Sequence, residues 1–165
     1  MIIVPTKNAV FYRRIALRTG PLCEERYTER KRLRLNGEVT EETIRKLLDE
    51  AELINIPIDL SGRDLTNLKG TKLFAGRDLS YSDLTGIRST ELDFSRGSLF
   101  KARLIRAAIT KSAFASTNFA ETDVWNADFS FATSFDRVIG LEKVKHLGTA
   151  KLAPRIFRML TKQQY

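Results

Sequence analysis

The sequence predicts an all-β solenoid, in which the chain turns at short regular intervals and stacks coil upon coil. Three columns of residues with a period of five predict this fold. A large apolar residue occupies ten of the eleven slots between Leu79 and Phe129, with Ser89 as the gap. A small residue stands two positions earlier from Gly97 to Ala127, and Asp or Asn often stands between the two. A period of five fits neither the 3.6 residues of a helical turn nor simple strand alternation, so the chain must turn once per unit.

Each unit is therefore expected to be one short extended side followed by a corner. Residues two apart share a side of an extended chain, so the large and the small residue both point into a common core. The Asp or Asn between them faces outward, where its side-chain oxygen accepts hydrogen bonds from backbone N–H groups at the turn. At residue 89 the order is reversed, because Ile87 is large and Ser89 is small. We expect a local exchange of volume at this position rather than a cavity.

The units Tyr81-Ser82-Asp83-Leu84-Thr85 and Asn126-Ala127-Asp128-Phe129-Ser130 resemble those of the pentapeptide-repeat family. The resemblance covers about residues 58–136. It implies a right-handed quadrilateral β-helix of roughly four coils, with four pentapeptides in each coil. Residues twenty apart then stack, so that Phe74, Phe94 and Phe114 form one internal column.

We divide the chain into three parts. Residues 1–55 are a basic N-terminal segment that ends in an amphipathic capping helix at about 41–53, with Thr40 as its N-cap. Residues 56–136 form the β-helix, with a break of register near residues 67–73 that we interpret as a shortened corner. Residues 137–165 are expected to be a basic helical cap or tail, with a short helix at 141–147 and another that begins at Pro154.

The residue inventory argues against catalysis. Cys23 and His146 are the only cysteine and histidine among 165 residues, which excludes an internal disulfide, a cysteine-based metal cluster and any zinc site that needs two histidines. Gly62, Gly70 and Gly76 lack the spacing of a phosphate-binding loop. We therefore expect a protein that is not an enzyme and has no cofactor or metal. The start of the chain lacks the pattern of a secretory signal and no apolar run is long enough to span a bilayer, so we expect a cytoplasmic location.

The net charge of +8 is concentrated at the ends of the chain. Residues 1–34 hold nine Lys or Arg against three Glu, residues 137–165 hold seven against one, and residues 56–136 hold ten of each sign. Some members of the pentapeptide-repeat family protect or inhibit topoisomerases with a strongly acidic β-helix that imitates duplex DNA. This sequence departs from that pattern, because its repeat region is neutral and its flanks are basic, which disfavours imitation of a duplex.

Several outward positions carry apolar residues, which makes them candidates for binding. They are Phe100, Ile105, Trp125 and Phe131, and Arg103, Arg106 and Lys111 lie near them in sequence. Either a terminal segment folds back over these side chains, or they form a protein-binding surface of aromatic residues and arginine. The C-terminal residues Arg155, Arg158 and Lys162 either bind an acidic partner, RNA or an anionic membrane, or cap the coil with their charges in water.

These observations favour a non-catalytic protein-binding or scaffolding module, with a protein as the main partner. One alternative is a modulator or protector of a topoisomerase such as DNA gyrase. Another is a nucleic-acid-associated protein that binds through its basic ends, and a homodimer is also compatible with the sequence. Either such a dimer has its seam at Phe135, Val138, Ile139 and Leu141, or these residues belong to the C-terminal cap.

Overall fold

A computed structural model describes residues 32–152 of the chain. The candidate residues Arg155, Arg158 and Lys162, the helix expected from Pro154, and Cys23 lie outside the described residues. Within residues 32–152 no helix combines the length and the apolar character that crossing a membrane requires.

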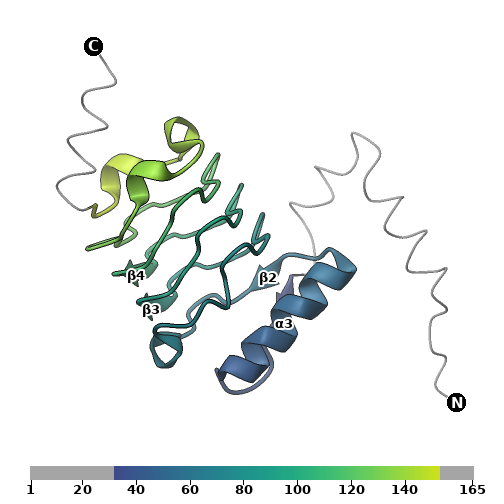
Figure 1. The fold of residues 1–165 in the computed structure, drawn as a ribbon. Coiled ribbons are helices and arrows are strands. Elements are labelled where there is room, and N and C mark those ends of the chain that lie inside the picture. Colours follow the sequence, from purple (N-terminus) through teal and green to yellow (C-terminus); the bar gives the residue numbers. More distant parts are fainter. Residues whose placement is uncertain (1–31, 153–165) are drawn as a thin grey trace, which may run out of the picture.

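The N-terminal part of the described chain covers the first coil. Strand β1 (Leu33–Arg34) pairs in parallel with β2 (Ile58–Asp59). Helix α3 (Glu41–Ile54) connects the two strands in the sequence and lies beside the coil (Figure 1). The side chain of Thr40 accepts a hydrogen bond from the N–H of Thr43, which confirms the predicted N-cap. The buried face of α3 joins the core of the coil through four residues: Ile44, Leu47, Leu48 and Ala51.

The repeat region has the pentapeptide-repeat fold that the sequence predicts. Parallel backbone bridges join residues twenty apart, in four series that follow one another along the chain. These series are Asp78–Ser98–Asn118, Asp83–Arg103–Asp123, Arg88–Ala108–Asp128 and Asp93–Ala113–Thr133. The third series includes the paired strands β3 (Arg88–Thr90) and β4 (Ala108–Thr110), which lie side by side in Figure 1. Twenty residues therefore complete one coil of four units.

The large apolar residues of the repeat form the core in columns. Phe74 stacks on Phe94 with ring centroids 5.1 Å apart, and Phe94 stacks on Phe114 at 5.3 Å, as the twenty-residue spacing predicts. Most of the small residues are buried beside them, and the hydroxyl groups of Ser112, Thr117 and Thr122 bind backbone groups. Thr117 donates to the carbonyl of Phe94 at 2.8 Å, and Thr122 donates to that of Leu99 at 2.6 Å. The core thus leaves these polar atoms satisfied.

The predicted break of register is present, but its interpretation as a shortened corner is wrong. Asp59 pairs with Asp83 and Asp64 pairs with Arg88, so the first coil contains twenty-four residues instead of twenty. The additional four residues fall between Leu65 and Gly76, a stretch that contains the short 3-10 helix η1 (Thr66–Leu68), where Leu68 turns into the core. The corner is therefore lengthened, and an additional apolar residue fills the wider end of the coil.

The coil continues beyond residue 136, where the sequence analysis places its end. Thr133, Ile139, Lys145 and Lys151 each pair with the preceding coil, so the period changes from five residues to six. Each unit of six holds one 3-10 turn, namely η2 (Phe135–Arg137), η3 (Leu141–Lys143) and η4 (Leu147–Thr149). The helix expected at 141–147 is thus replaced by two such turns, and residues 137–152 belong to the last coil rather than to a separate helical cap.

The six-residue units pack on the end of the core, where Val138, Leu141, Val144 and Leu147 stay partly exposed. In each unit the residue before the 3-10 turn is left-handed, with φ of 55° at Ser134, 74° at Gly140 and 59° at His146. The next N–H groups bond within the turn, as when Arg137 N–H donates to the carbonyl of Ser134. The turned chain places Phe135 against Phe114 at 5.5 Å between ring centroids. Phe135 is only 1% exposed, so it belongs to the core and not to a dimer seam.

Replacing Ser89 with alanine should stabilise the protein by about 1 kcal/mol. Ser89 is buried in the core slot beside Ile87, as the sequence predicts, and its Oγ has no hydrogen-bond partner. Removing the hydroxyl therefore removes a desolvation cost without removing a bond. Thermal and denaturant unfolding would measure the change. Ser112→Ala is the matched control, since the Ser112 Oγ accepts from Leu92 N–H and donates to the carbonyl of Thr110. Equal effects of the two substitutions would contradict this account.

Candidate functional site

One side of the coil carries charges of both signs in a single line, and we call it the Arg103 face. Its outward residues are Arg34, Asp59, Asp83, Arg103, Asp123 and Lys145, each paired in parallel with the next along the coil axis. The line begins on strand β1 and ends in the last coil. Because neighbouring rungs of a parallel ladder lie about 4.8 Å apart, their side chains are close enough to form ion pairs.

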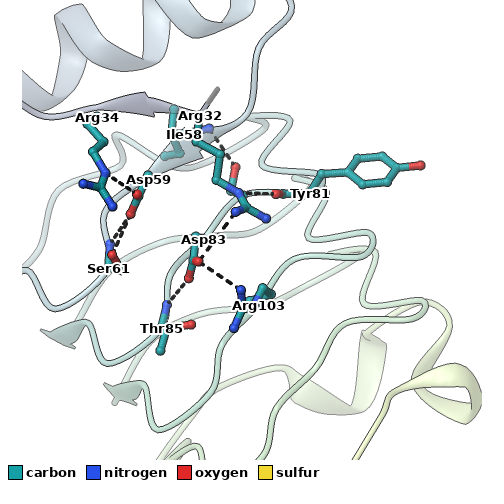
Figure 2. A network of polar contacts seen from close by, with 10 residues as sticks. Arg32, Arg34, Ile58, Asp59, Ser61, Tyr81, Asp83, Thr85 and Arg103 are labelled. Atoms are coloured by element: carbon teal, nitrogen blue, oxygen red, sulfur yellow. Dashed lines mark hydrogen bonds and ion pairs between the residues drawn. The ribbon is translucent and has the colours of Figure 1, made fainter. Parts of the chain in front are cut away.

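Asp83 joins three parts of the chain on this face (Figure 2). Its Oδ2 lies 3.7 Å from Nη1 of Arg32 and 3.5 Å from Nη1 of Arg103, while its Oδ1 accepts a hydrogen bond from the N–H of Thr85. Arg32 also donates from Nε to the carbonyl of Tyr81 at 3.1 Å. These contacts tie the segment that enters β1 to the third and fourth rungs of the face, Asp83 and Arg103.

Asp59 is the corresponding carboxylate one rung earlier. Burial alone would raise the pKa of Asp59, but hydrogen bonds from Ser61 and Arg34 lower the pKa below its ordinary value. The Arg34 Nε lies 2.6 Å from the Asp59 Oδ2 (Figure 2). The N-terminal end of the Arg103 face is therefore a set of satisfied ion pairs that hold β1 on the coil.

The corner before Arg103 gathers two aromatic rings around a lysine. The rings of Tyr81 and Phe100 meet edge to face, with centroids 5.6 Å apart. Nζ of Lys101 lies 5.0 Å from the Phe100 centroid and 5.7 Å from that of Tyr81, and it also lies 3.7 Å from the Glu121 carboxylate. Phe100 is thus half-buried among neighbours of its own corner.

The corner after Arg103 brings together Ile105, Arg106 and Trp125. The guanidinium carbon of Arg106 lies 4.9 Å from the centre of the Trp125 ring, which is a cation–π contact. Ile105 and Trp125 are half-buried and occupy the same position in successive coils, while Arg106 is exposed. An apolar surface and a stacked cation therefore lie side by side on the outside of the coil.

Five of the candidate residues from the sequence lie on or beside the Arg103 face: Phe100, Arg103, Ile105, Arg106 and Trp125. Lys111 lies one corner further along the chain, where its Nζ is 3.9 Å from the Glu91 carboxylate. It does not belong to the same surface. Phe131 lies on the Lys111 corner and is 74% exposed.

Charged residues of opposite sign lie next to one another in neighbouring coils. The basic residues of one coil face acidic residues of the next, as in the pairs Lys101–Glu121 and Lys111–Glu91. His146 Nδ1 lies 2.8 Å from Asp123 Oδ1 in the same manner. Among residues 32–152 no three His, Cys, Asp or Glu side chains gather as a metal site. Charges of opposite sign thus offset one another between adjacent coils.

Sequence reasoning missed Lys101 and Tyr81 as members of this surface. The signal was available, because Tyr81, Lys101 and Glu121 are spaced by twenty and so fall in one column of corner residues. It also missed Arg32, whose contact with Asp83 joins a residue outside the repeat to one inside it. No periodicity predicts that contact.

Neither a protein-family model nor a curated protein matches the sequence. Among solved structures, the chain is similar to HetL, a pentapeptide repeat protein involved in heterocyst differentiation regulation from the cyanobacterium Nostoc sp. strain PCC 7120. The identity is 17% and the TM-score is 0.36, over 59% of this chain and 40% of that one. The aligned part therefore spans less than half of HetL. The pentapeptide-repeat fold of this chain rests on its own twenty-residue ladders.

Proposed function

We propose that this pentapeptide-repeat chain is a non-catalytic protein-binding or scaffolding module on a right-handed, four-sided β-helix. Ile105 and Trp125 carry the proposal, because they are apolar at outward corner positions, which are expected to be polar. A protein partner is the usual reason for aromatic and arginine side chains on the outside of a rigid fold. The coil would act as a rigid support that presents this corner and Arg103 in a fixed arrangement.

The distribution of charge favours a protein partner over DNA imitation. On the Arg103 face the carboxylates of Asp59 and Asp83 are paired with Arg34, Arg32 and Arg103. A face with alternating, paired charges does not present the continuous negative potential of a duplex. The two alternatives, topoisomerase modulation and nucleic-acid binding, become outcomes of the experiment.

Photo-crosslinking from two positions of the same coil tests the proposal. A benzoylphenylalanine at Trp125 replaces one aromatic ring with another on the proposed surface. The control places the same group at Ala115, which occupies the equivalent corner position two corners away and is also half-buried. We expect a protein adduct from position 125 in the source cells and none from position 115, with or without nuclease.

The adduct is then tested with purified proteins. Trp125→Ala should weaken binding of the crosslinked protein about tenfold or more, as a central aromatic residue of an interface does. Equal adducts from both positions, or binding unchanged by Trp125→Ala in a folded protein, would refute the proposed surface. An adduct with a topoisomerase, followed by an effect in a supercoiling assay, would favour the first alternative. Loss of the adduct on nuclease treatment would favour the second.

A further inference from the structure

One coil carries a cation at each of its four left-handed corner residues. These residues are Arg96, Lys101, Arg106 and Lys111, with φ of 62°, 55°, 55° and 53°. Two of the four are neutralised along their columns, because Lys101 meets Glu121 at 3.7 Å and Lys111 meets Glu91 at 3.9 Å. The other two have no such partner.

Arg106 stands in a column without acidic residues. The residues twenty before and twenty after it are Gly86 and Asn126, and the N–H of Arg106 donates to the carbonyl of Trp125 at 2.8 Å. Within residues 32–152 the Arg106 guanidinium forms no ion pair. The column of Arg96 likewise contains no acidic residue, because Gly76 and Ser116 stand twenty before and twenty after it.

Arg106 differs from Arg96 in having an aromatic ring, that of Trp125, beside its guanidinium. Its guanidinium lies over the Trp125 ring at 4.9 Å, whereas the corner residues next to Arg96, Ser95 and Ala115, offer no ring. A guanidinium that stacks on an indole uses its face and keeps its N–H donors in the plane at its edge. That edge matches the two oxygens of a carboxylate. The stacking also restricts the side chain, so less conformational freedom is lost when it binds.

We infer that this corner binds a carboxylate side chain of a protein partner, flanked by an apolar residue that packs against Ile105 and Trp125. The inference rests on the proposed function and adds the chemistry of the partner. A single carboxylate fits the site better than a polyanion, because the cation on the adjoining Arg103 face, Arg103 itself, is already paired with Asp83 at 3.5 Å, so Arg106 offers one cation rather than a row of them.

Trp125 is the only tryptophan of the chain, so its fluorescence reports on this corner directly. The probes are three synthetic peptides: acetyl-Gly-Leu-Glu-Leu-Gly-amide and the same peptide with Gln or Lys in place of Glu. We expect a saturable change of emission with the Glu peptide. The Gln and Lys peptides should bind about tenfold more weakly or worse, since a charged hydrogen-bonded pair is worth about 1.5–3 kcal/mol.

Two variants distinguish binding at the Arg106 corner from a general effect of positive charge on peptide binding. Arg106→Gln should weaken binding of the Glu peptide about tenfold, while Arg96→Gln, which removes the same charge from the same coil, should leave it unchanged. Arg106→Lys should fall between the wild type and Arg106→Gln, because an ammonium cannot pair with both oxygens in one plane. Both corners are exposed, and unfolding curves would verify that the variants are folded.

The comparison of peptides uses the wild-type protein, so it does not depend on the variants. No saturable response to the Glu peptide at millimolar concentration, equal binding of the Glu and Gln peptides, or equal effects of the Arg106 and Arg96 variants would each overturn carboxylate recognition. These results would leave the crosslinking test of protein binding intact. Tighter binding of a single-stranded oligonucleotide than of the Glu peptide would overturn the inference in favour of a nucleic acid.

Discussion

Phe114→Ala should lower the free energy of unfolding by about 3–5 kcal/mol. The Phe114 side chain is fully buried, and its ring lies 5.3 to 5.6 Å, centroid to centroid, from those of Phe94, Phe119, Phe129 and Phe135. A rod of stacked coils cannot collapse around a missing ring without breaking its backbone ladders, so the cavity would remain. Denaturant unfolding of both proteins would measure the loss.

Phe131→Ala is the matched control for Phe114→Ala. The Phe131 ring is 74% exposed, and its backbone is left-handed with φ of 60°. Removing it should change the free energy of unfolding by no more than about 0.5 kcal/mol, as is usual for an exposed side chain. If the two alanine variants were equally stable, the phenylalanine column would not be the core that the structure describes.

Gly140→Ala should destabilise the last coil by about 2–4 kcal/mol. A Cβ at residue 140 would lie 2.7 Å from the Cβ of Ala120 and 2.9 Å from its Cα, and the φ of Gly140 is 74°. The equivalent left-handed residues Ser134 and His146 do carry side chains. The close approach to Ala120 is therefore what requires glycine here, with the left-handed backbone as an additional cost.

Gly148→Ala provides the comparison for this substitution. No atom lies within 4 Å of a Cβ built at Gly148, and its φ is not positive. We expect its effect on the unfolding midpoint to be small. Hydrogen exchange should locate the damage of Gly140→Ala in the pairing between residues 118 and 139. Unchanged exchange protection there would mean that the coils do not approach as closely as described.

The five-residue columns could be predicted from the sequence because every unit places the same demand on its side chains. Large residues such as Leu99 and Leu104 must point inward, and corner residues such as Ile105 must point outward. The same reasoning selected the residues around Arg103. Helix α3 was also predictable, since Thr40 and the stripe from Ile44 to Ala51 are local signals.

Other features depend on how coils meet, and the repeat alone does not specify this. The spacing from Leu65 to Phe74 reveals a break, but whether the coil is longer or shorter depends on which residues pair across coils. The six-residue period after Thr133 has only three units. Its residues Leu141, Val144 and Leu147 follow one another at intervals of three, which reads equally well as one face of a short helix. The contact of Arg32 with Asp83 joins two segments that share no period.

The regular coils fix the distance between the two ends of the β-helix. Strand β1 and helix α3 lie at one end of the coil and the six-residue units at the other, so the number of pentapeptides between the twenty-four-residue first coil and these units sets the distance between the two ends. Twenty further residues would raise Trp125 by one rung, about 4.8 Å, and five would move it to the next side. The position of the Arg106 corner therefore has two coordinates, a height and a direction, and insertions in multiples of five residues change them in separate steps.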